Sequence, residues 1–383
     1  MEDKIRVLSI FGTRPEAVKM APLIHELQND CAIQSLVCIT AQHRQMLDQV
    51  MDIFSLDADY DLDIMKERQT LTEITTRVLE GLSQVIDSAS PDIILVHGDT
   101  TTSFVASLAA FYKQIPVGHV EAGLRTFNKY EPFPEEMNRK LTGTIATLHF
   151  SPTSGAKENL LAENVDSNEI FVTGNTVIDA LKTTIQEDYI FTDKNLNSLD
   201  YINNKVITIT AHRRENLGEP LKDICSAINE IVQHNSDVEV VYAVHMNPSV
   251  REVVYEMLGN NDKIHLVEPL DIKDMHNLLK KSYLVLTDSG GLQEEVPSLG
   301  KPVLVLRNVT ERPEGVEAGT LKLVGTNKDD IVREANLLLT NKDEYEKMAQ
   351  ARNPFGDGRA SARIVDAIKY HFNLVDNPPE EFV

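Results

Sequence analysis

The sequence predicts an α/β protein built from two doubly wound, Rossmann-like domains that face each other across a cleft. Short β-branched runs alternate with amphipathic stretches along almost the whole chain, the pattern of parallel sheets covered on both faces by helices. The alternation is interrupted by a polar stretch at residues 189–204 and then starts again. A chain of 383 residues is also longer than one ordinary hydrophobic core requires.

The first half of the chain contains β-branched runs that we expect to be strands at Ile5–Phe11, Ser35–Thr40, Ile93–His97, Pro116–Val120 and Ile170–Thr173. Apolar residues recur with the period of a helix between them, and we expect helices at Ala17–Gln28, Leu71–Ser88, Thr101–Tyr112 and Glu135–Gly143.

The second half repeats the pattern, with expected strands at Val206–Ala211, Glu239–Val244, Ile264–Val267, Tyr283–Thr287 and Pro302–Leu306. We place the first domain at residues 1–173 and the second at residues 174–360. Residues 361–383 are expected to form a C-terminal helix that packs back on the first domain. In open α/β sheets, ligands bind beyond the carboxyl ends of the strands, so the informative polar residues are those that directly follow a strand.

The composition excludes several classes of partner. The chain has 37 basic and 59 acidic side chains, a net charge of −22, which repels nucleic acid and anionic membranes. The three cysteines lack metal-ligand spacing and fit a reducing compartment. The N-terminus leads directly into an apolar strand, and no apolar run approaches the roughly 18 residues of a membrane helix. We therefore expect a cytoplasmic protein.

The first strand is followed by the motif "FGTRPEAVKMAP", which carries Gly12 for a turn, Pro15 as a helix-start residue, and the cations Arg14 and Lys19. It could be a plain strand-to-helix loop with a surface arginine. Alternatively, an anionic ligand lies between the two cations, which the helix dipole otherwise disfavours at a helix N-terminus.

Two later strands end in a histidine followed by an acidic residue: His97 with Asp99 in "VHGDTTTS", and His119 with Glu121 in "GHVEAGLRT". Three interpretations remain open. Asp99 could act as a helix N-cap beside core histidines, the carboxylates could do chemistry, or the four side chains could bind a metal. Next, "PFPEEMNR" adds Glu135, which could also be an ordinary residue of a helical first turn.

In the second half, His212 follows a strand in "TAHRREN", and His245 follows another in "YAVHMNPSV". A single histidine after a strand is usually structural, but the arginines beside His212 make a phosphate contact equally plausible. The chain has no Gly-x-Ser-x-Gly elbow, and Ser289 has no nearby base in the sequence, so nothing indicates a serine nucleophile.

The segment "DSGGLQEE" places Ser289, Gly290 and Gly291 at an expected helix start, where unpaired backbone N–H groups favour an anion. Glu295 lies about one turn further on, and we expect Glu294 to be either solvated or favoured by the helix dipole. Arg312 follows in "TERPEG".

Together these segments closely resemble the non-hydrolysing UDP-N-acetylglucosamine 2-epimerases. The matching stretches extend from residue 11 to about residue 320 and include "TAQHRQMLDQV", "FVTGNTVIDAL" and "DSGGLQEEVPSLGKPVLVLR", while "NPFGDGRAS" fits near the end. The resemblance implies a glycosyltransferase-B-like fold, a UDP-GlcNAc substrate, no metal and no nicotinamide cofactor, and a homodimer. It makes the second domain the UDP-binding domain.

By position, the resemblance implies substrate-binding residues at Arg14, Lys19, Asp99, Glu121, His212, Ser289, Gly290, Gly291, Glu295 and Arg312. The catalytic set it implies is Asp99, Glu121, Glu135 and His212. Part of the family binds a second UDP-GlcNAc as an activator, and the corresponding residues are Gln42, Gln45, Arg68 and His245. Leu270 replaces a glutamine found in some members, which affects one contact to the uracil base.

The implied reaction is reversible inversion of C2 between UDP-GlcNAc and UDP-ManNAc, supplying ManNAc for cell-envelope polysaccharide. No carbonyl acidifies the C2–H bond, so expulsion of UDP must first give C1 oxocarbenium character, and loss of the C2 proton then yields a 2-acetamidoglucal. The alternatives are a glycosyltransferase or a hydrolysing epimerase on the same scaffold, a non-catalytic UDP-sugar sensor, and a metal-dependent phosphohydrolase.

Overall fold

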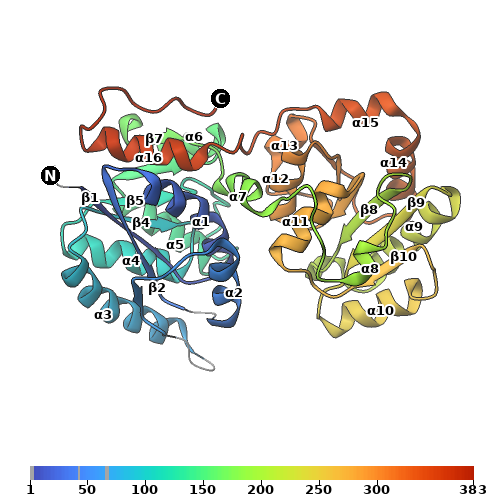
Figure 1. The fold of residues 1–383 in the computed structure, drawn as a ribbon, viewed down its shortest axis with the longest axis horizontal. Helices are drawn as coiled ribbons and strands as arrows, with labels where there is room; N and C mark the ends of the chain where they lie inside the picture. Colours follow the sequence, from blue (N-terminus) through green and yellow to red (C-terminus); the bar gives the residue numbers. More distant parts are fainter. Residues whose placement is uncertain (1–3, 42–43, 65–68) are drawn as a thin grey trace. The chain divides into compact units, whose positions relative to one another are not determined.

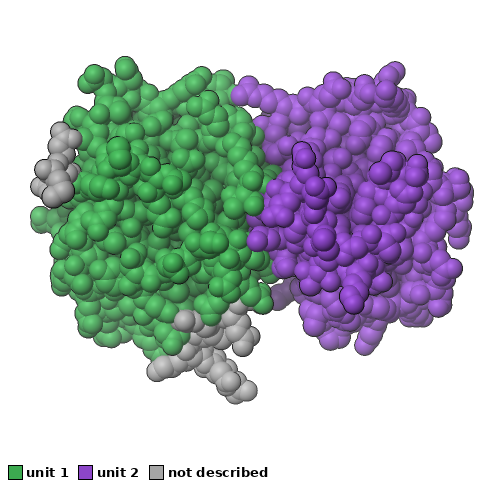
Figure 2. Space-filling view, in the orientation of Figure 1, with its two compact units in different colours: residues 1–183, 355–383 green, residues 184–354 purple. Residues whose placement is uncertain are grey.

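The structure, a computed structural model, describes residues 4–41, 44–64 and 69–383 (Figure 1). It divides into two compact units, coloured separately in Figure 2: unit 1 comprises residues 1–183 and 355–383, and unit 2 residues 184–354. The sequence analysis placed the boundaries at residues 173 and 360. The chain leaves unit 1 later, after residue 183, and re-enters it earlier, at residue 355, because the segments near these two points bind each other within unit 1. The N–H of Asn175 donates to the carbonyl of Phe355 at 2.7 Å.

Unit 1 contains one parallel sheet with strand order β3-β2-β1-β4-β5-β6-β7. Its strands are β1 (Ile5–Phe11), β2 (Ile33–Ile39), β3 (Tyr60–Asp61), β4 (Ile93–His97), β5 (Val117–Val120), β6 (Leu148–Ser151) and β7 (Ile170–Val172). The sequence analysis missed β3 and β6. Both are very short, and β6 contains His149 and Ser151, so neither shows a continuous apolar run.

Helices cover both faces of this sheet. They are α1 (Arg14–Asn29), α2 (Arg44–Phe54), α3 (Leu71–Ala89), α4 (Thr101–Tyr112), α5 (Glu135–Ile145), α6 (Ser154–Ala162), α7 (Thr176–Thr184) and α16 (Ala360–His371). Helices α3, α4 and α5 pack side by side, whereas α1 contacts α2 and α16. The core between the sheet and α3 and α4 contains Leu8, Ile10, Val78 and Val105, all without exposed surface.

The loop before α4 decides one of the interpretations left open for Asp99. The N-cap is Thr100, whose hydroxyl accepts from the N–H of Ser103 at 3.1 Å, and not Asp99. Asp99 lies one residue earlier, so capping does not explain the presence of a carboxylate at this position.

Unit 2 contains a second parallel sheet with strand order β10-β9-β8-β11-β12-β13. Its strands are β8 (Lys205–Thr210), β9 (Val238–Ala243), β10 (Ile264–Val267), β11 (Leu284–Thr287), β12 (Val303–Val305) and β13 (Leu321–Leu323). The edge strand β13 was not predicted, because three residues containing a lysine give no strand pattern. Both sheets are thus doubly wound and parallel, as predicted.

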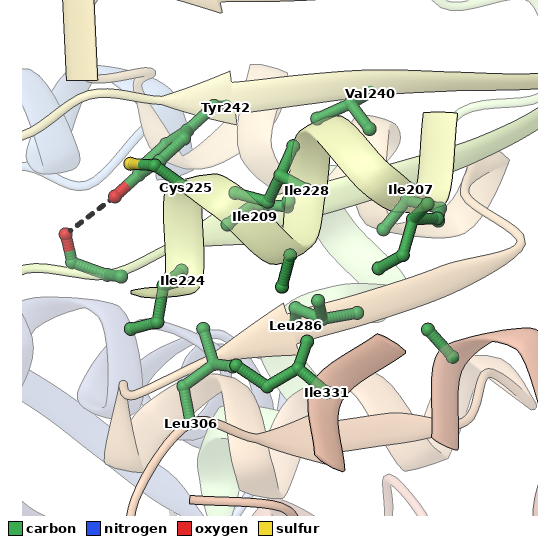
Figure 3. Close-up of a cluster of buried hydrophobic side chains, with 14 of the residues drawn as sticks. Ile207, Ile209, Ile224, Cys225, Ile228, Val240, Tyr242, Leu286, Leu306 and Ile331 are labelled. Carbon is green, nitrogen blue, oxygen red and sulfur yellow. Dashed lines mark hydrogen bonds between the residues drawn. The ribbon is translucent and has the colours of Figure 1, made fainter. Parts of the chain in front are cut away.

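The helices of unit 2 are α8 (Lys194–Asn197), α9 (Glu219–His234), α10 (Pro248–Leu258), α11 (Ile272–Lys281), α12 (Gly290–Glu295), α13 (Pro313–Glu317), α14 (Lys328–Thr340) and α15 (Lys342–Ala349). Helix α9 packs between α10 and α14. Figure 3 shows the core beneath α9, where Ile207 and Ile209 of β8 meet Ile224 and Ile228. The hydroxyl of the buried Tyr242 donates to the carbonyl of Ala211 at 3.1 Å, which ties β9 to the loop after β8 (Figure 3).

In the part of the chain that the structure describes, no helix is long and apolar enough to span a membrane.

Candidate active site

Two polar clusters occupy the carboxyl ends of the strands, one in each unit. The cluster of unit 1 is centred on Glu121, which directly follows β5. Its backbone has a positive φ of 62°, a conformation that costs a residue with a side chain about 1–2 kcal/mol. Its carboxylate is ion-paired with Lys19 of α1 and accepts a hydrogen bond from Nδ2 of Asn175 at 2.9 Å. A strained, mostly buried carboxylate held by two donors from distant segments is typical of a functional residue.

Three buried histidines lie on the neighbouring strands β4, β5 and β6: His97, His119 and His149. Burial lowers the pKa of His97 to about 4, of His119 to about 3 and of His149 to about 4, so all are neutral at pH 7. The ring of His119 bonds to the carbonyl of Gly98 at 2.7 Å. They are therefore core histidines, one of the interpretations left open by the sequence.

Metal binding finds no support in the geometry. Among residues 4–41, 44–64 and 69–383, no group of three or more histidine, cysteine, aspartate or glutamate side chains is arranged to hold a metal ion.

Asp99, in the loop after β4, is held from α5. Arg139 forms an ion pair with the Asp99 carboxylate and a second one, 3.0 Å long, with Glu136. Asn138 donates to the carbonyl oxygen of Asp99 at 3.0 Å. Glu135 opens the same helix, and its Oε2 atom is buried without a hydrogen-bond partner among the described residues. The motif "PFPEEMNR" therefore contributes a carboxylate and also positions a second one.

The loop after β1 is joined to the loop after β4 by Glu16. Its buried carboxylate accepts from the N–H groups of Gly12 and Thr13 at 3.1 and 2.8 Å, and from the hydroxyl of Thr100 at 2.6 Å. Burial raises the pKa of Glu16. Arg14 begins α1. The sequence analysis singled out the cations of this loop and overlooked the carboxylate that fixes it.

The cluster of unit 2 is organised by Asp288, the residue after β11, which has no exposed surface. One carboxylate oxygen, Oδ2, accepts from the N–H groups of His212 and Arg213 at 2.7 and 2.8 Å and from Nδ2 of Asn216 at 3.0 Å. This aspartate therefore holds the entire loop that follows β8. Sequence reasoning missed it because its partners lie more than 70 residues away.

The imidazole of His212 stacks on that of His245, with ring centres 5.0 Å apart and planes 8° from parallel. Burial is the main cause that lowers the pKa of His212, and the charge of Asp288 acts in the opposite direction. The Nδ1 atom of His245 accepts from the N–H of Asn247 at 3.1 Å.

The Ser-Gly-Gly turn begins α12, with Ser289 as the N-cap residue. A side chain added at Gly290 would lie 3.8 Å from the Arg213 guanidinium, 3.9 Å from a carboxylate oxygen of Glu311 and 4.0 Å from the Arg312 guanidinium, so this glycine leaves space among these three groups. A Cβ at Gly291 would be 3.2 Å from a carboxylate oxygen of Glu295. Two guanidinium groups, donors that an anion site requires, line the space beside the turn together with the carboxylates of Glu311 and Glu295.

The two glutamates of "DSGGLQEE" have separate partners. Glu295 bonds to Nε2 of the buried His276 at 3.1 Å. Glu294 is 2% exposed and forms an ion pair with Arg312, so the prediction that it is solvated is wrong. Helix α12 directs it inward, where it holds the arginine beside the turn.

Three residues of the predicted activator site lie wholly or partly outside the described residues. Gln42 and Arg68 lie outside the described residues, and the side chain of Gln45 is also outside them although its backbone belongs to α2.

The family model described as UDP-N-acetylglucosamine 2-epimerase matches residues 25–369. The chain belongs to this family. It is 58% identical to the UDP-N-acetylglucosamine 2-epimerase of Bacillus subtilis (strain 168), covering 99% of each chain. A crystal structure from Listeria monocytogenes is 60% identical, with a TM-score of 0.94 over 99% of this chain and 100% of that one. The UDP-GlcNAc 2-epimerase from Neisseria meningitidis, solved bound to UDP-GlcNAc, is 50% identical with a TM-score of 0.84, covering 97% and 100%.

Proposed function

We propose that the protein interconverts UDP-GlcNAc and UDP-ManNAc by eliminating UDP to a 2-acetamidoglucal and adding it back. Family membership supports the substrate, since relatives at 50–58% identity carry the epimerase name and one of them is solved with UDP-GlcNAc bound. The observation that carries the mechanism is the Glu121 carboxylate, strained at φ 62° and held by Lys19 and Asn175.

The chemistry separates two tasks. The C1–O bond to the β-phosphate breaks with its electron pair on the phosphate oxygen, and the charge that develops at C1 makes the C2 proton removable by a carboxylate. Returning a proton to the opposite face of C2 and re-forming the C1–O bond gives the epimer. The reaction needs carboxylates at C2 and cations at the leaving diphosphate.

We assign the carboxylate task to unit 1, with Asp99, Glu121 and Glu135. Asp99 and Glu121 are each held by a cation, Arg139 and Lys19 respectively, which preorganises them.

We assign the UDP task to unit 2. Arg312 and the amides of Gly290 and Gly291 contact the diphosphate with Ser289, His212 stabilises the charge on it, and Glu295 accepts from the ribose hydroxyls. The two guanidinium groups within about 4 Å of the Gly290 Cβ position support this role. In unit 1, Arg14 and Lys19 add positive charge at the start of α1.

The proposal is tested by incubating the protein with UDP-GlcNAc in D₂O in the presence of EDTA. We expect UDP-ManNAc and recovered UDP-GlcNAc, both deuterated at C2. The variants Asp99→Asn and Glu121→Gln should lose at least about 100-fold in rate. Glu163→Gln is the matched control, because Glu163 is a unit 1 carboxylate that binds only Arg125 and Lys140 among the described residues. Products without C2 deuterium would refute the elimination, and free ManNAc would indicate a hydrolysing enzyme.

We also propose, on the family resemblance, that the enzyme is a homodimer and that a second UDP-GlcNAc acts as an activator through Gln42, Gln45, Arg68 and His245. The envelope pathway that uses ManNAc is proposed on the same ground. Sedimentation of the protein with and without UDP-GlcNAc tests the first statement, and the dependence of rate on UDP-GlcNAc concentration in His245→Ala tests the second.

A further inference from the structure

The second oxygen of the Asp288 carboxylate distinguishes this residue from an ordinary loop-holding aspartate. Oδ2 receives all three hydrogen bonds, from His212, Arg213 and Asn216. Oδ1 is buried and has no hydrogen-bond partner among the described residues. The group beside it is Nδ1 of His212, at 3.4 Å. An unpaired, fully buried carboxylate oxygen is costly unless it faces a positive or donating group.

The direction of Oδ1 is fixed by the bonds on Oδ2. Two of the three donors are backbone N–H groups of the residues that follow β8, and β8 is hydrogen-bonded along its length to β11, which carries Asp288. The carboxylate therefore cannot turn Oδ1 away from His212 without losing the bonds that hold the loop.

We propose that Asp288 is a positioning residue for His212, which fixes the imidazole with Nδ1–H toward the buried carboxylate so that Nε2 is the nitrogen available to the substrate. The proposal rests on the proposed function, in which His212 acts at the diphosphate. A carboxylate behind a histidine sets both the tautomer and the orientation of the ring.

This arrangement determines what His212 can do. In the neutral form Nδ1 carries the proton and Nε2 has only a lone pair, so a neutral His212 cannot donate to a phosphate oxygen. Once protonated, it donates from Nε2, and Asp288 compensates the new charge. Asp288 and Glu215 face His212 with negative charge, whereas Arg213 and the stacked His245 oppose its protonation. Asp288 thus makes His212 a group that takes up and releases a proton at Nε2.

A purely structural role for Asp288 predicts a different outcome for Asp288→Asn. The three donors on Oδ2 require an acceptor, so the amide oxygen must occupy that position and the amide NH₂ must occupy the Oδ1 position. The loop keeps its bonds, but Nδ1 of His212 now faces a donor and must become an acceptor. The variant therefore reverses the tautomer while leaving the loop in place.

The matched control is Asp274→Asn. Asp274 is a buried aspartate of the same unit, 3% exposed, whose Oδ1 accepts from the Tyr189 hydroxyl at 2.8 Å and the Thr192 N–H at 3.1 Å. The variant removes a buried negative charge that holds a loop, and the hydrogen bonds of Asp274 within the described part of the chain involve no histidine.

Two measurements on the full-length protein test the proposal. Nitrogen-15 NMR of histidine-labelled protein, with the His212 signals assigned from His212→Gln, should show Nδ1–H in the wild type and Nε2–H in Asp288→Asn. Steady-state kinetics should show kcat lower by at least about 100-fold in Asp288→Asn, with KM and the Kd for UDP within about three-fold, and little change in Asp274→Asn.

The proposal is overturned by a wild-type His212 protonated at Nε2 alone, or by an Asp288→Asn variant whose kcat stays within three-fold of the wild type. A change confined to KM and UDP affinity would also overturn it, since that outcome indicates loop-holding alone. A failure of this proposal can be distinguished from a failure of the proposed function. The tautomer is measured without substrate, whereas C2 deuteration in D₂O is measured with the wild type.

Discussion

Asn175→Asp tests whether the Glu121 carboxylate depends on its neighbours. The Oδ1 atom of Asn175 accepts from the N–H of Val177 at 3.1 Å, so in the variant one carboxylate oxygen keeps that position and the other faces Glu121 at 2.9 Å. Two unit charges at this distance repel by about 6 kcal/mol at an effective dielectric constant of about 20. Holding a shared proton at pH 7 costs only about 4 kcal/mol, given an ordinary carboxyl pKa near 4.3. The ion pair of Glu121 with Lys19 offsets part of this repulsion, so the variant raises the pKa of the carboxyl pair toward neutral pH.

The shared proton has opposite effects on stability and activity. The folded variant binds more protons than the unfolded chain above about pH 4, so its free energy of unfolding, relative to the wild type, falls by up to about 1.4 kcal/mol per pH unit as the pH rises toward 7. The rate at pH 7 should fall at least about 10-fold and recover at higher pH, because Glu121 must be ionised to act.

The assay is kcat between pH 6 and 9, with urea unfolding at the same values. Asn229→Asp is the control, because Asn229 donates to the carbonyl of Met257 at 3.0 Å, not to a carboxylate. If the kcat–pH curve of Asn175→Asp superimposes on that of the wild type, Asn175 does not act on Glu121 and the reasoning is wrong.

Three further outcomes follow from the structure. The free energy of unfolding of Glu121→Gly should be about 1 kcal/mol higher than that of Glu121→Ala, because the positive φ of residue 121 favours glycine. Thermal unfolding of the two variants checks this. Glu294→Gln removes the buried partner of Arg312 and should weaken UDP binding about 10-fold by calorimetry, with unchanged UDP affinity contradicting the role of Glu294. Burial lowers the folded-state pKa of His149 to about 4, so the folded protein takes up fewer protons than the unfolded chain as the pH falls from about 6.5, and the free energy of unfolding declines. His149→Asn should reduce this pH dependence of the free energy of unfolding by up to about 1.4 kcal/mol per pH unit. Urea unfolding at pH 7, 6 and 5 measures it.

The alternation of strands and helices could be predicted because each strand of five or more residues is rich in apolar and β-branched residues, as in "IRVLSIF" and "IILVH". The strands that escaped prediction have two to four residues. These short segments become strands because they pair with a neighbouring strand, so their own sequences contain little signal that predicts a strand.

The predicted site depended on position along the chain, which singles out residues without identifying their partners. Asp99, Glu121, His212 and Ser289 were singled out because each follows a strand. Asn175 and Asp288, which hold two of them, also follow strands, but their importance depends on contacts between loops 54 and 76 residues apart. Such contacts depend on strand order, which a single sequence does not state.

The overall charge of −22 and the expected anionic substrate are compatible because arginines of unit 2 are held in place by nearby carboxylates. Arg312 is paired with the buried Glu294, and Arg307 lies 3.3 Å from both Glu215 and Glu311. A long side chain held by a buried partner has already lost its rotational freedom, so less of the binding energy of a diphosphate is spent on ordering it. Glu215 and Glu311 are about half exposed, and they can turn toward water when a stronger anion takes their place. The positive charge needed for UDP is therefore local and preorganised, and the surplus of acidic residues elsewhere does not oppose it beyond a screening length of about 8 Å at physiological ionic strength.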